Sequence, residues 1–341
     1  MFDFVTIMAF IAAAICQGTP LLFGAVGETI TEKSGNLNLG IPGIMYIGGI
    51  SGIIGGYLYE GFLCEKLAVT PIPILCVIIS LVSSLLGAAF IALIYSFLTI
   101  TLKANQNVVG LALTTLGVGL GNFYGGSLLK FFGKSGSISL YVTGNAYKTK
   151  IPFLSDHMGI FGETFLSFGF LVYVALVIAL VAHWILKKTR VGLNLRAVGE
   201  NPATADAAGI NVNLYKYLAT CIGGAIAGLG GLYFVMDYTM GAWTNNGFGD
   251  RGWLAIAIVI FALWKPRTAI LSSYVFGGLY IASVYVNFPG WLPINPGALK
   301  EIIKMLPYIV TIVVLVFTSS RKKKEHQPPQ SLGLSYFREE R

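Results

Sequence analysis

Charged residues are scarce in this sequence. Only 11% of its 341 residues are Asp, Glu, Lys or Arg, and 55% are hydrophobic, whereas soluble domains carry about 25% charged residues. A soluble fold of this composition would lack the polar side chains to cover its surface, so we expect the protein to sit in a lipid bilayer. The net charge of +8 does not indicate nucleic-acid binding, because basic residues cluster beside apolar stretches, as at Lys187, Lys188 and Arg190. Such clusters encode membrane topology.

Residues that carry chemistry are also few. The four cysteines have no CxxC or metal-like spacing, and neither do the three histidines, so we expect no disulfide and no metal site. The sequence contains no GxxxxGK[ST] phosphate loop and no GxSxG nucleophile elbow. We therefore expect no catalytic residue and no cofactor. If this chain moves a solute against a gradient, the energy comes from another subunit.

Long apolar stretches fill most of the chain. A membrane-spanning helix needs about 20 apolar residues, and no basic region marks the first stretch as a cleaved signal peptide. We predict an all-α polytopic bundle of about nine spans, within a range of eight to ten. The short segment 252–265 and the glycine-rich segment 35–43 are candidates for broken or re-entrant helices. The predicted spans are 4–25, 38–59, 72–98, 106–129, 163–186, 215–236, 252–265, 268–287 and 302–319.

Glycine is abundant, with 42 residues, and recurs at four-residue spacing. One row is formed by Gly48, Gly52 and Gly56, and others occur at 117–125 and 224–228. On a helix these residues share a face and let a neighbouring helix approach closely. The rows predict a tightly packed bundle rather than a substrate site.

The basic residues orient the spans. If 187–214 is cytoplasmic, alternation places 26–37, 99–105, 265–267 and the residues after 319 on the same side, and these segments together with the adjoining Lys216 hold 15 of the 23 Lys and Arg. Positive charge favours the cytoplasmic side. We predict a membrane domain over 1–319, with a cytoplasmic loop at 187–214 and an external loop at 131–160. Residues 320–341 form a basic cytoplasmic tail, which we expect to be disordered beyond its basic run.

The cytoplasmic loop contains the pattern of a short helix. Asn201 suits the N-cap and Pro202 the first helical position. Alanines follow, and Gly209 can end the helix in the left-handed conformation. The pattern predicts a two-turn helix over 202–208. A helix this short is marginal in water, so it docks either on its own bundle or on a partner.

Three segments resemble a known family. They are the loop from Arg190 to Val212 (RVGLNLRAVGENPATADAAGINV), the segment 27–45 (GETITEKSGNLNLGIPGIM) and the segment 250–266 (DRGWLAIAIVIFALWKP). Their sequences, order and spacing are similar to those of ABC (ATP-binding-cassette) importer permeases, in the nucleoside and simple-sugar branch, over roughly residues 20–290. Pro42, Asp250 and Ala262 depart from the family pattern, at positions that affect span packing.

The resemblance implies a set of partners and a role for the cytoplasmic helix. It implies a second permease subunit, in a heterodimer, an ABC ATPase and an extracytoplasmic substrate-binding protein, in the inner or plasma membrane of a prokaryote. By this resemblance the short helix engages the ATPase and this chain hydrolyses nothing itself. The implied coupling residues are Gly199, Glu200, Asn201, Pro202, Asp206, Ala207, Ala208 and Gly209.

A solute pathway requires polar groups that face the interior, because a polar group facing lipid is costly. Amide side chains both donate and accept hydrogen bonds, which suits a neutral, hydroxylated solute such as a nucleoside. Asp237, Asp250 and Arg251 are polar as well, but at span ends they can simply mark the membrane interface. The candidate pathway residues are Asn36, Asn38, Asn105, Gln106, Asn107, Asn122, Tyr124, Asn245 and Asn246.

Other functions remain open. The same machine could carry a simple sugar or a branched-chain amino acid. A self-powered secondary transporter would need a buried ionisable relay, and acids are sparse in the predicted spans. A membrane enzyme would need a catalytic cluster, which the sequence does not provide.

Overall fold

The computed structural model describes residues 4–149, 162, 167–286, 296–320 and 327–338. Within these ranges the chain is almost entirely helical or in turns, and extended backbone pairs only at an isolated bridge between Ser139 and Ala242. The longer helices are α1 (Phe4–Glu32), α2 (Ile41–Gly56), α4 (Pro73–Ser96), α5 (Gln106–Phe131), α9 (Phe170–Lys188), α12 (Val212–Tyr233), α14 (Pro266–Tyr285) and α16 (Leu306–Ser320). The shorter ones are α3 (Cys64–Lys66), α6 (Tyr141–Tyr147), α10 (Arg190–Glu200), α11 (Pro202–Ala207), α13 (Arg251–Phe261) and α15 (Pro296–Lys304).

Seven helices of the described chain are long and apolar enough to cross a membrane. They are α1, α5, α9 and α14, together with α2, α4 and α12, which π-helical turns extend to Lys66, Thr101 and Tyr238. The predicted number of about nine spans is therefore not confirmed. The segments at 252–265 and 302–319 form α13, with 11 residues, and α16, with 15 residues. At about 1.5 Å per residue, neither helix reaches across a 30 Å hydrocarbon core by itself.

Helices α2 and α12 form the centre of the bundle. They are 83% and 72% buried within this single chain, whereas at most 39% of each other span is buried. Helix α2 packs against α4, α5 and α12, and α1 packs against α12 and α14. Glycine makes this packing close, because a Cβ on Gly231 would lie 1.8 Å from the Met45 carbonyl oxygen, and one on Gly48 would lie 2.5 Å from Gly228. The predicted glycine rows do bring helices together.

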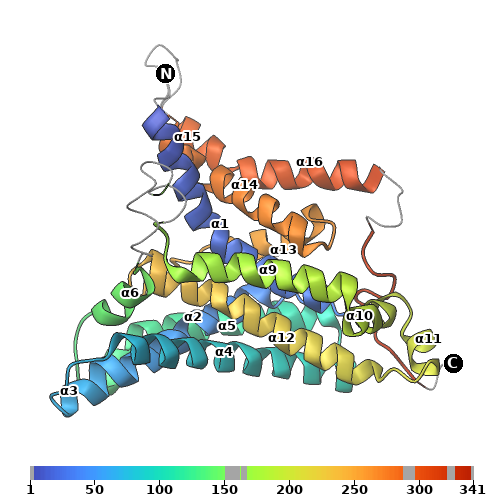
Figure 1. The fold of residues 1–341 in the computed structure, drawn as a ribbon, viewed down its shortest axis with the longest axis horizontal. Coiled ribbons are helices and arrows are strands. Elements are labelled where there is room, and N and C mark those ends of the chain that lie inside the picture. Colours follow the sequence, from blue (N-terminus) through green and yellow to red (C-terminus); the bar gives the residue numbers. More distant parts are fainter. Residues whose placement is uncertain (1–3, 150–161, 163–166, 287–295, 321–326, 339–341) are drawn as a thin grey trace.

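Five separate segments gather at one end of the bundle, which we call the α11 end. They are the 33–40 loop, residues 102–105, residues 189–211, Trp264 with its neighbours, and residues 327–338. Hydrogen bonds and a cation–π contact join several of them: Gly35 accepts a hydrogen bond from Gly333, Trp264 donates to Glu32, and Lys103 stacks on Phe337. In Figure 1 this end lies at the right, where α10 and α11 are labelled. Segments that the positive-charge pattern assigned to one side of the membrane thus lie at one end of the bundle.

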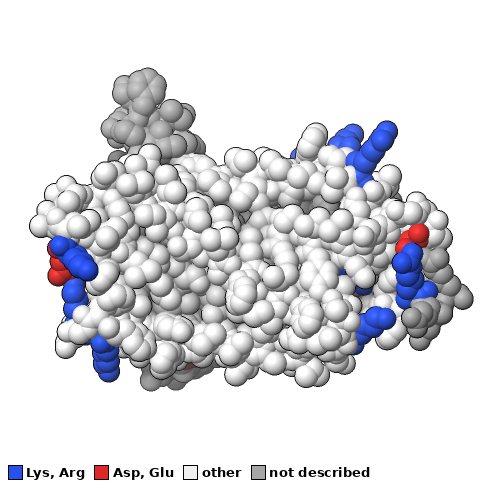
Figure 2. Space-filling view, turned by 90° about the horizontal axis from the view of Figure 1, so that it is seen from below, with Lys and Arg blue, Asp and Glu red and all other residues white. Residues whose placement is uncertain are grey.

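An uncharged belt separates the two ends. Figure 2 shows Lys, Arg, Asp and Glu at the two ends of one face, with a broad band of other residues between them. Leu, Val, Phe and Ile side chains are exposed along the helices of that band, for example Leu86, Phe90 and Leu271. A surface of this kind is stable in hydrocarbon and not in water.

Two non-helical connections in the described part of the chain pack closely against the helices of the bundle. The 33–40 loop joins α1 to α2, and residues 239–250 join α12 to α13. The second segment contacts the membrane helices directly, because a Cβ on Gly125 of α5 would overlap the Trp243 indole. Backbone of this kind is tolerated at membrane depth only where protein or water satisfies its polar groups. The predicted break near 35–43 is thus observed, and 252–265 is a shortened helix that follows a non-helical segment.

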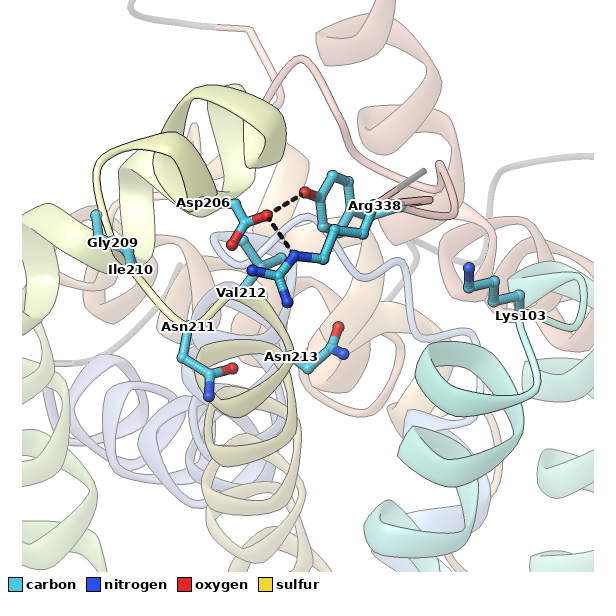
Figure 3. Close-up of a pocket in the computed structure, with 9 residues that line it drawn as sticks. Lys103, Asp206, Gly209, Ile210, Asn211, Val212, Asn213 and Arg338 are labelled. Atoms are coloured by element: carbon cyan, nitrogen blue, oxygen red, sulfur yellow. Dashed lines mark hydrogen bonds and ion pairs between the residues drawn. The ribbon is translucent and has the colours of Figure 1, made fainter. Parts of the chain in front are cut away.

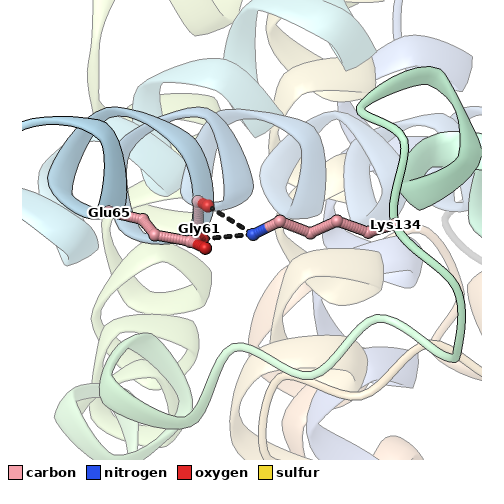
Figure 4. Close-up of polar contacts among 3 residues, drawn as sticks. All are labelled: Gly61, Glu65 and Lys134. Atoms are coloured by element: carbon pink, nitrogen blue, oxygen red, sulfur yellow. Dashed lines mark hydrogen bonds and ion pairs between the residues drawn. The ribbon is translucent and has the colours of Figure 1, made fainter.

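The end opposite α11 is fastened by side chains of the α2 extension. The Glu60 carboxylate accepts hydrogen bonds from the backbone N–H groups of Val142 and Thr143, at 3.0 and 2.9 Å, and so caps α6. Lys134 donates to the Gly61 carbonyl at 3.3 Å and pairs with Glu65 (Figure 4). The part of the predicted 131–160 loop that the structure describes is therefore held on the bundle, and 150–160 lies outside the described residues.

The C-terminal segment differs from expectation. We predicted disorder beyond the basic run, but residues 327–338 fold into turns against the α11 end, with Pro329 and Ser331 buried. The N–H of Ser331 donates to Gly199 at 3.0 Å, and that of Gly333 donates to Gly35 at 3.1 Å. Polar composition suggested a solvated tail, but glycine and serine permit close backbone contacts that composition does not reveal.

Candidate functional site

The amides predicted near the first loop are buried and hold that loop in place. Asn36 donates to Thr220 at 3.1 Å, and Gln106 accepts from the Leu37 N–H at 2.7 Å. The Asn38 side chain accepts from the Gly40 N–H at 2.9 Å, while its own N–H donates to Glu28 at 3.0 Å. Gln106 and Asn38 thus satisfy backbone N–H groups of the loop, as an irregular buried segment requires, and Asn36 ties the loop to α12.

The other amide candidates lie along α5 and at its far end. Asn105 caps α5 by accepting from the N–H groups of Asn107 and Val108, at 3.0 and 3.2 Å, and the Asn107 side chain is exposed. At the opposite end of α5, Asn122 exchanges two hydrogen bonds with Asn246, of 2.8 and 3.1 Å. Asn245 accepts from the Trp243 indole at 3.0 Å. The Tyr124 ring is exposed and packs edge-to-face against Phe123.

One face of α5 is uncovered. Gly110, Leu113, Gly117 and Gly121 are buried toward the bundle, with Gly117 against Gly43 of α2. The opposite face carries the side chains of Asn107, Leu111, Thr115, Gly119, Asn122 and Gly126, at the three- and four-residue spacing of one helix face. These residues are exposed or half-buried in the single chain. We call them the α5 face.

A buried arginine organises the second break. Arg251, at the start of α13, donates to Gln17 of α1 at 2.9 and 3.2 Å and to the carbonyls of Gly247 and Phe248 at 3.2 and 2.8 Å. Its guanidinium lies 4.6 Å from the Phe234 ring and 4.7 Å from the Tyr280 ring. The residue therefore does not mark a membrane interface. It satisfies irregular backbone inside the bundle, and cation–π contacts replace a carboxylate partner.

Two acidic residues of α1 are buried, although the sequence led us to expect few acidic residues within the spans. Glu28 and Glu32 are one turn apart, Glu28 binds the 33–40 loop, and Glu32 accepts from the Trp264 indole. Gln17 was also missed. Glu28, Glu32 and Gln17 all lie within or next to apolar runs. A polar residue in such a run is conspicuous, and that signal could have identified the three as candidate functional residues.

The predicted cytoplasmic helix is present as α11. The Asn201 side chain accepts from the Thr204 N–H at 3.0 Å, and Pro202 is the first helical residue. The helix ends one residue earlier than predicted, and Gly209 has φ +82°. Of its residues only Ala205 is fully buried, in a small cluster with Val198 and Val212. The caps were therefore predicted correctly, and α11 leaves much of its surface free for a partner.

The other implied coupling residues lie around α11. Gly199 ends α10, where a Cβ would lie 2.3 Å from the Lys33 carbonyl oxygen. Burial lowers the pKa of the Lys33 ammonium from its ordinary value, and the neighbouring Glu200 carboxylate opposes that shift. Glu200, Ala207 and Ala208 are exposed, and Asp206 is half-buried.

A cavity of about 440 Å³ opens beside α11. Its walls come from the turn between α11 and α12, from Lys103 in the loop before α5, and from Tyr336 and Arg338 of the C-terminal segment (Figure 3). Asp206 points into it and binds the Tyr336 hydroxyl at 2.8 Å and the Arg338 guanidinium at 3.2 Å. The cavity is polar and open, so it suits a side chain of a partner protein better than an apolar ligand. Within the described residues no group of His, Cys, Asp and Glu could hold a metal ion.

Known sequences match almost the whole chain. A protein-family model described as the permease component of branched-chain amino acid transport systems matches residues 10–315. The nucleoside ABC transporter permease protein NupC of Lactococcus lactis is 31% identical, over 98% of this chain and 98% of its own. The guanosine ABC transporter permease protein NupQ of Bacillus subtilis is 30% identical, over 99% and 100%. TsgC13 of Haloferax volcanii, assigned as a glucose ABC transporter permease, is 31% identical, over 96% and 97%.

The chain therefore belongs to the family of permease components of branched-chain amino acid transport systems. It is the membrane-spanning permease subunit of an ABC transporter. The seven apolar helices and the two non-helical segments packed among them are the structure of that subunit.

The Arg251 cluster predicts a measurable stability effect. Arg251→Met leaves the Gln17 side-chain oxygen and two carbonyls buried without donors, at about 1–3 kcal/mol for each group. We expect a large fall in the thermal unfolding midpoint of the purified protein in detergent. Gln17→Leu combined with Arg251→Met removes one orphaned acceptor, so the double variant should unfold at a higher temperature than Arg251→Met. A double variant whose losses simply add would contradict the proposed dependence of the two residues on each other.

Proposed function

We propose that this subunit imports nucleosides, delivered by an extracytoplasmic binding protein and driven by a separate ATPase. The observation that carries the substrate is similarity along the full length to NupC and NupQ, whose names specify nucleosides and guanosine. The amide-bearing α5 face supports it, because amides match the hydroxyl groups of a sugar and the edges of a base.

A second substrate has a specific observation in its favour. TsgC13 is as similar to this chain as NupC is, so a simple sugar is the alternative. A branched-chain amino acid, suggested only by the family description, is disfavoured because a zwitterion needs compensating charges or helix ends. The α5 face carries no charged residue.

The α5 face supports a pathway between two permease subunits. The Asn107 amide would be costly if it faced lipid, whereas the Thr115 hydroxyl donates to the Leu111 carbonyl, and the described part of the chain leaves both side chains exposed. A second permease that approaches α5 would enclose these groups and Asn122. The buried amides Asn36, Asn38 and Gln106 contribute to that pathway by holding the loop at its α11 end.

The second permease is proposed to be a related, different chain. Two permease proteins from each of three organisms resemble this sequence: NupB and NupC, NupP and NupQ, and TsgB13 and TsgC13. The members of each pair share a substrate in their names. This pattern supports a heterodimer.

A transport assay tests the substrate. We expect the complex of this chain with its partner permease and ATPase, in proteoliposomes with the binding protein added, to take up a labelled purine or pyrimidine nucleoside in an ATP-dependent manner. Excess unlabelled nucleoside should abolish uptake, whereas glucose and leucine should not. Competition by glucose, without competition by nucleosides, would establish the sugar alternative.

We also propose that the α11 end faces the cytoplasm, with the C-terminus inside. The excess of Lys and Arg at that end supports this orientation. In a variant without native cysteines, single cysteines at the exposed positions Ser137 and Ala203 should react with an impermeant maleimide from opposite sides. Labelling of Ala203→Cys in intact cells would reverse the orientation and exclude contact between α11 and a cytoplasmic ATPase.

We propose that α11 transmits ATP hydrolysis to the membrane helices. A substitution at Gly209 tests this role through the backbone alone. A Cβ there would meet no atom within 4 Å, but the backbone has φ +82°. Gly209→Val imposes strain, whereas Gly209→Asn is tolerated in this conformation. We expect normal membrane insertion of both variants, but loss of uptake and weaker ATPase association only for Gly209→Val. Equal uptake by both would leave α11 as a simple linker.

A further inference from the structure

The C-terminal segment 327–338 connects parts of the α11 end that are distant in sequence. Its backbone bonds both to the end of α10, at Gly199, and to the 33–40 loop, at Gly35. The contacts are close, because a Cβ on Gly35 would lie 2.7 Å from the Ser331 hydroxyl, which itself bonds to the Gly199 carbonyl. These interactions fix the first half of the segment against the base of α1 and α2.

The second half of the segment binds α11. The Tyr336 hydroxyl donates to Asp206 at 2.8 Å, and the Arg338 guanidinium pairs with the same carboxylate oxygen at 3.2 Å. Between them, the Phe337 ring lies 3.9 Å from the Lys103 ammonium, in the loop before α5. The ring of Tyr336 also joins the small apolar cluster of Val198, Ala205 and Val212. Asp206 is thus the point at which the C-terminal segment holds α11.

Without this segment, α11 has little to hold it. It has six residues, of which only Ala205 is fully buried, and it packs on α10 and α12. A helix of this length needs tertiary contacts to persist. The 33–40 loop, in contrast, is bonded to α1, α4, α5 and α12 through Glu28, Tyr95, Gln106 and Thr220. The C-terminal segment links the weakly held helix to this firmly held loop.

We propose that residues 327–338 are a positioning segment that couples α11 to the membrane helices. Tyr336 and Arg338 hold Asp206, while Ser331 and Gly333 hold α10 and the 33–40 loop, so a displacement of α11 by the ATPase also displaces the base of the bundle. The inference rests on the proposed role of α11. The segment also forms one wall of the cavity beside α11, so it shapes the surface that the ATPase meets.

The test is the amount of solute transported per ATP hydrolysed by the reconstituted complex. In Tyr336→Phe/Arg338→Gln, we expect the complex to assemble and hydrolyse ATP, while the transport ratio falls about fivefold or more, the usual size of a coupling free energy between sites. Arg338→Lys retains the charge and should keep an intermediate ratio. Leu334→Ala, in the same segment but with an exposed side chain, is the matched control and should match wild type.

Two further variants separate positioning from general loss of folding. Ser331→Pro removes the N–H that binds Gly199 and should lower the ratio through the other end of the segment, with an unchanged thermal unfolding midpoint. Asp206→Asn added to Tyr336→Phe/Arg338→Gln should cause little further loss, because all three residues serve one contact. An unchanged ratio in both Tyr336→Phe/Arg338→Gln and Ser331→Pro would overturn the proposal.

The assay uses whichever solute the wild-type complex transports, so an error in substrate does not affect it. A wild-type complex that neither binds an ATPase nor transports any solute would refute the proposed function instead. If the Tyr336→Phe/Arg338→Gln variant lost ATPase binding and the Arg338→Lys variant kept it, that result would also support the positioning of α11. A rise of the transport ratio in the variants would show that the segment restrains coupling and would overturn the proposal.

Discussion

The hydrogen bonds that satisfy the 33–40 loop are the constraint on which the rest of the structure depends. A buried chain can leave helical geometry only if its backbone N–H and C=O groups find other partners, and most residues of this loop are buried. Glu28, Gln106 and Tyr95 provide such partners for the loop backbone, and Thr220 accepts from the Asn36 side chain, so four helices bind the loop. Because these side chains come from α1, α4, α5 and α12, the same bonds that make the break tolerable also fix those helices relative to one another.

The second non-helical segment, residues 239–250, also has backbone groups satisfied by a side chain, but by one of different chemistry. Residues 239–250 lead into Arg251, whose guanidinium donates two hydrogen bonds to the Gln17 side-chain oxygen and one to each of two backbone carbonyls. Aromatic faces of Phe234 and Tyr280 replace a counter-ion. The bundle therefore contains one non-helical segment held by carboxylate and amides and another held by a guanidinium. Helices α2 and α12, which adjoin them, are the most buried spans.

Much of this arrangement could be predicted from sequence, for identifiable reasons. Composition required a membrane, local rules placed the caps of α11 at Asn201 and Gly209, and glycine spacing predicted the close helix contacts. The predicted number of about nine spans is not confirmed, because hydropathy does not distinguish a complete crossing from a short apolar helix such as α13 or α16. The sequence could not predict which amides face a partner, because the burial of Asn36 and the exposure of Asn107 depend on tertiary packing. The folded C-terminal segment was missed because its contacts are largely through backbone.

Pro42 and Gly252 show how two of the sequence motifs restrict one another. Pro42 departs from the family pattern in the motif at 27–45, and Gly252 belongs to the motif at 250–266. In the structure a Cβ on Gly252 would lie 2.5 Å from the Pro42 Cα. The two motifs are thus opposite sides of one contact between α2 and α13. Because the first atom that such a Cβ would meet is the backbone Cα of residue 42, this approach of α13 to α2 requires glycine at position 252 whichever side chain position 42 carries.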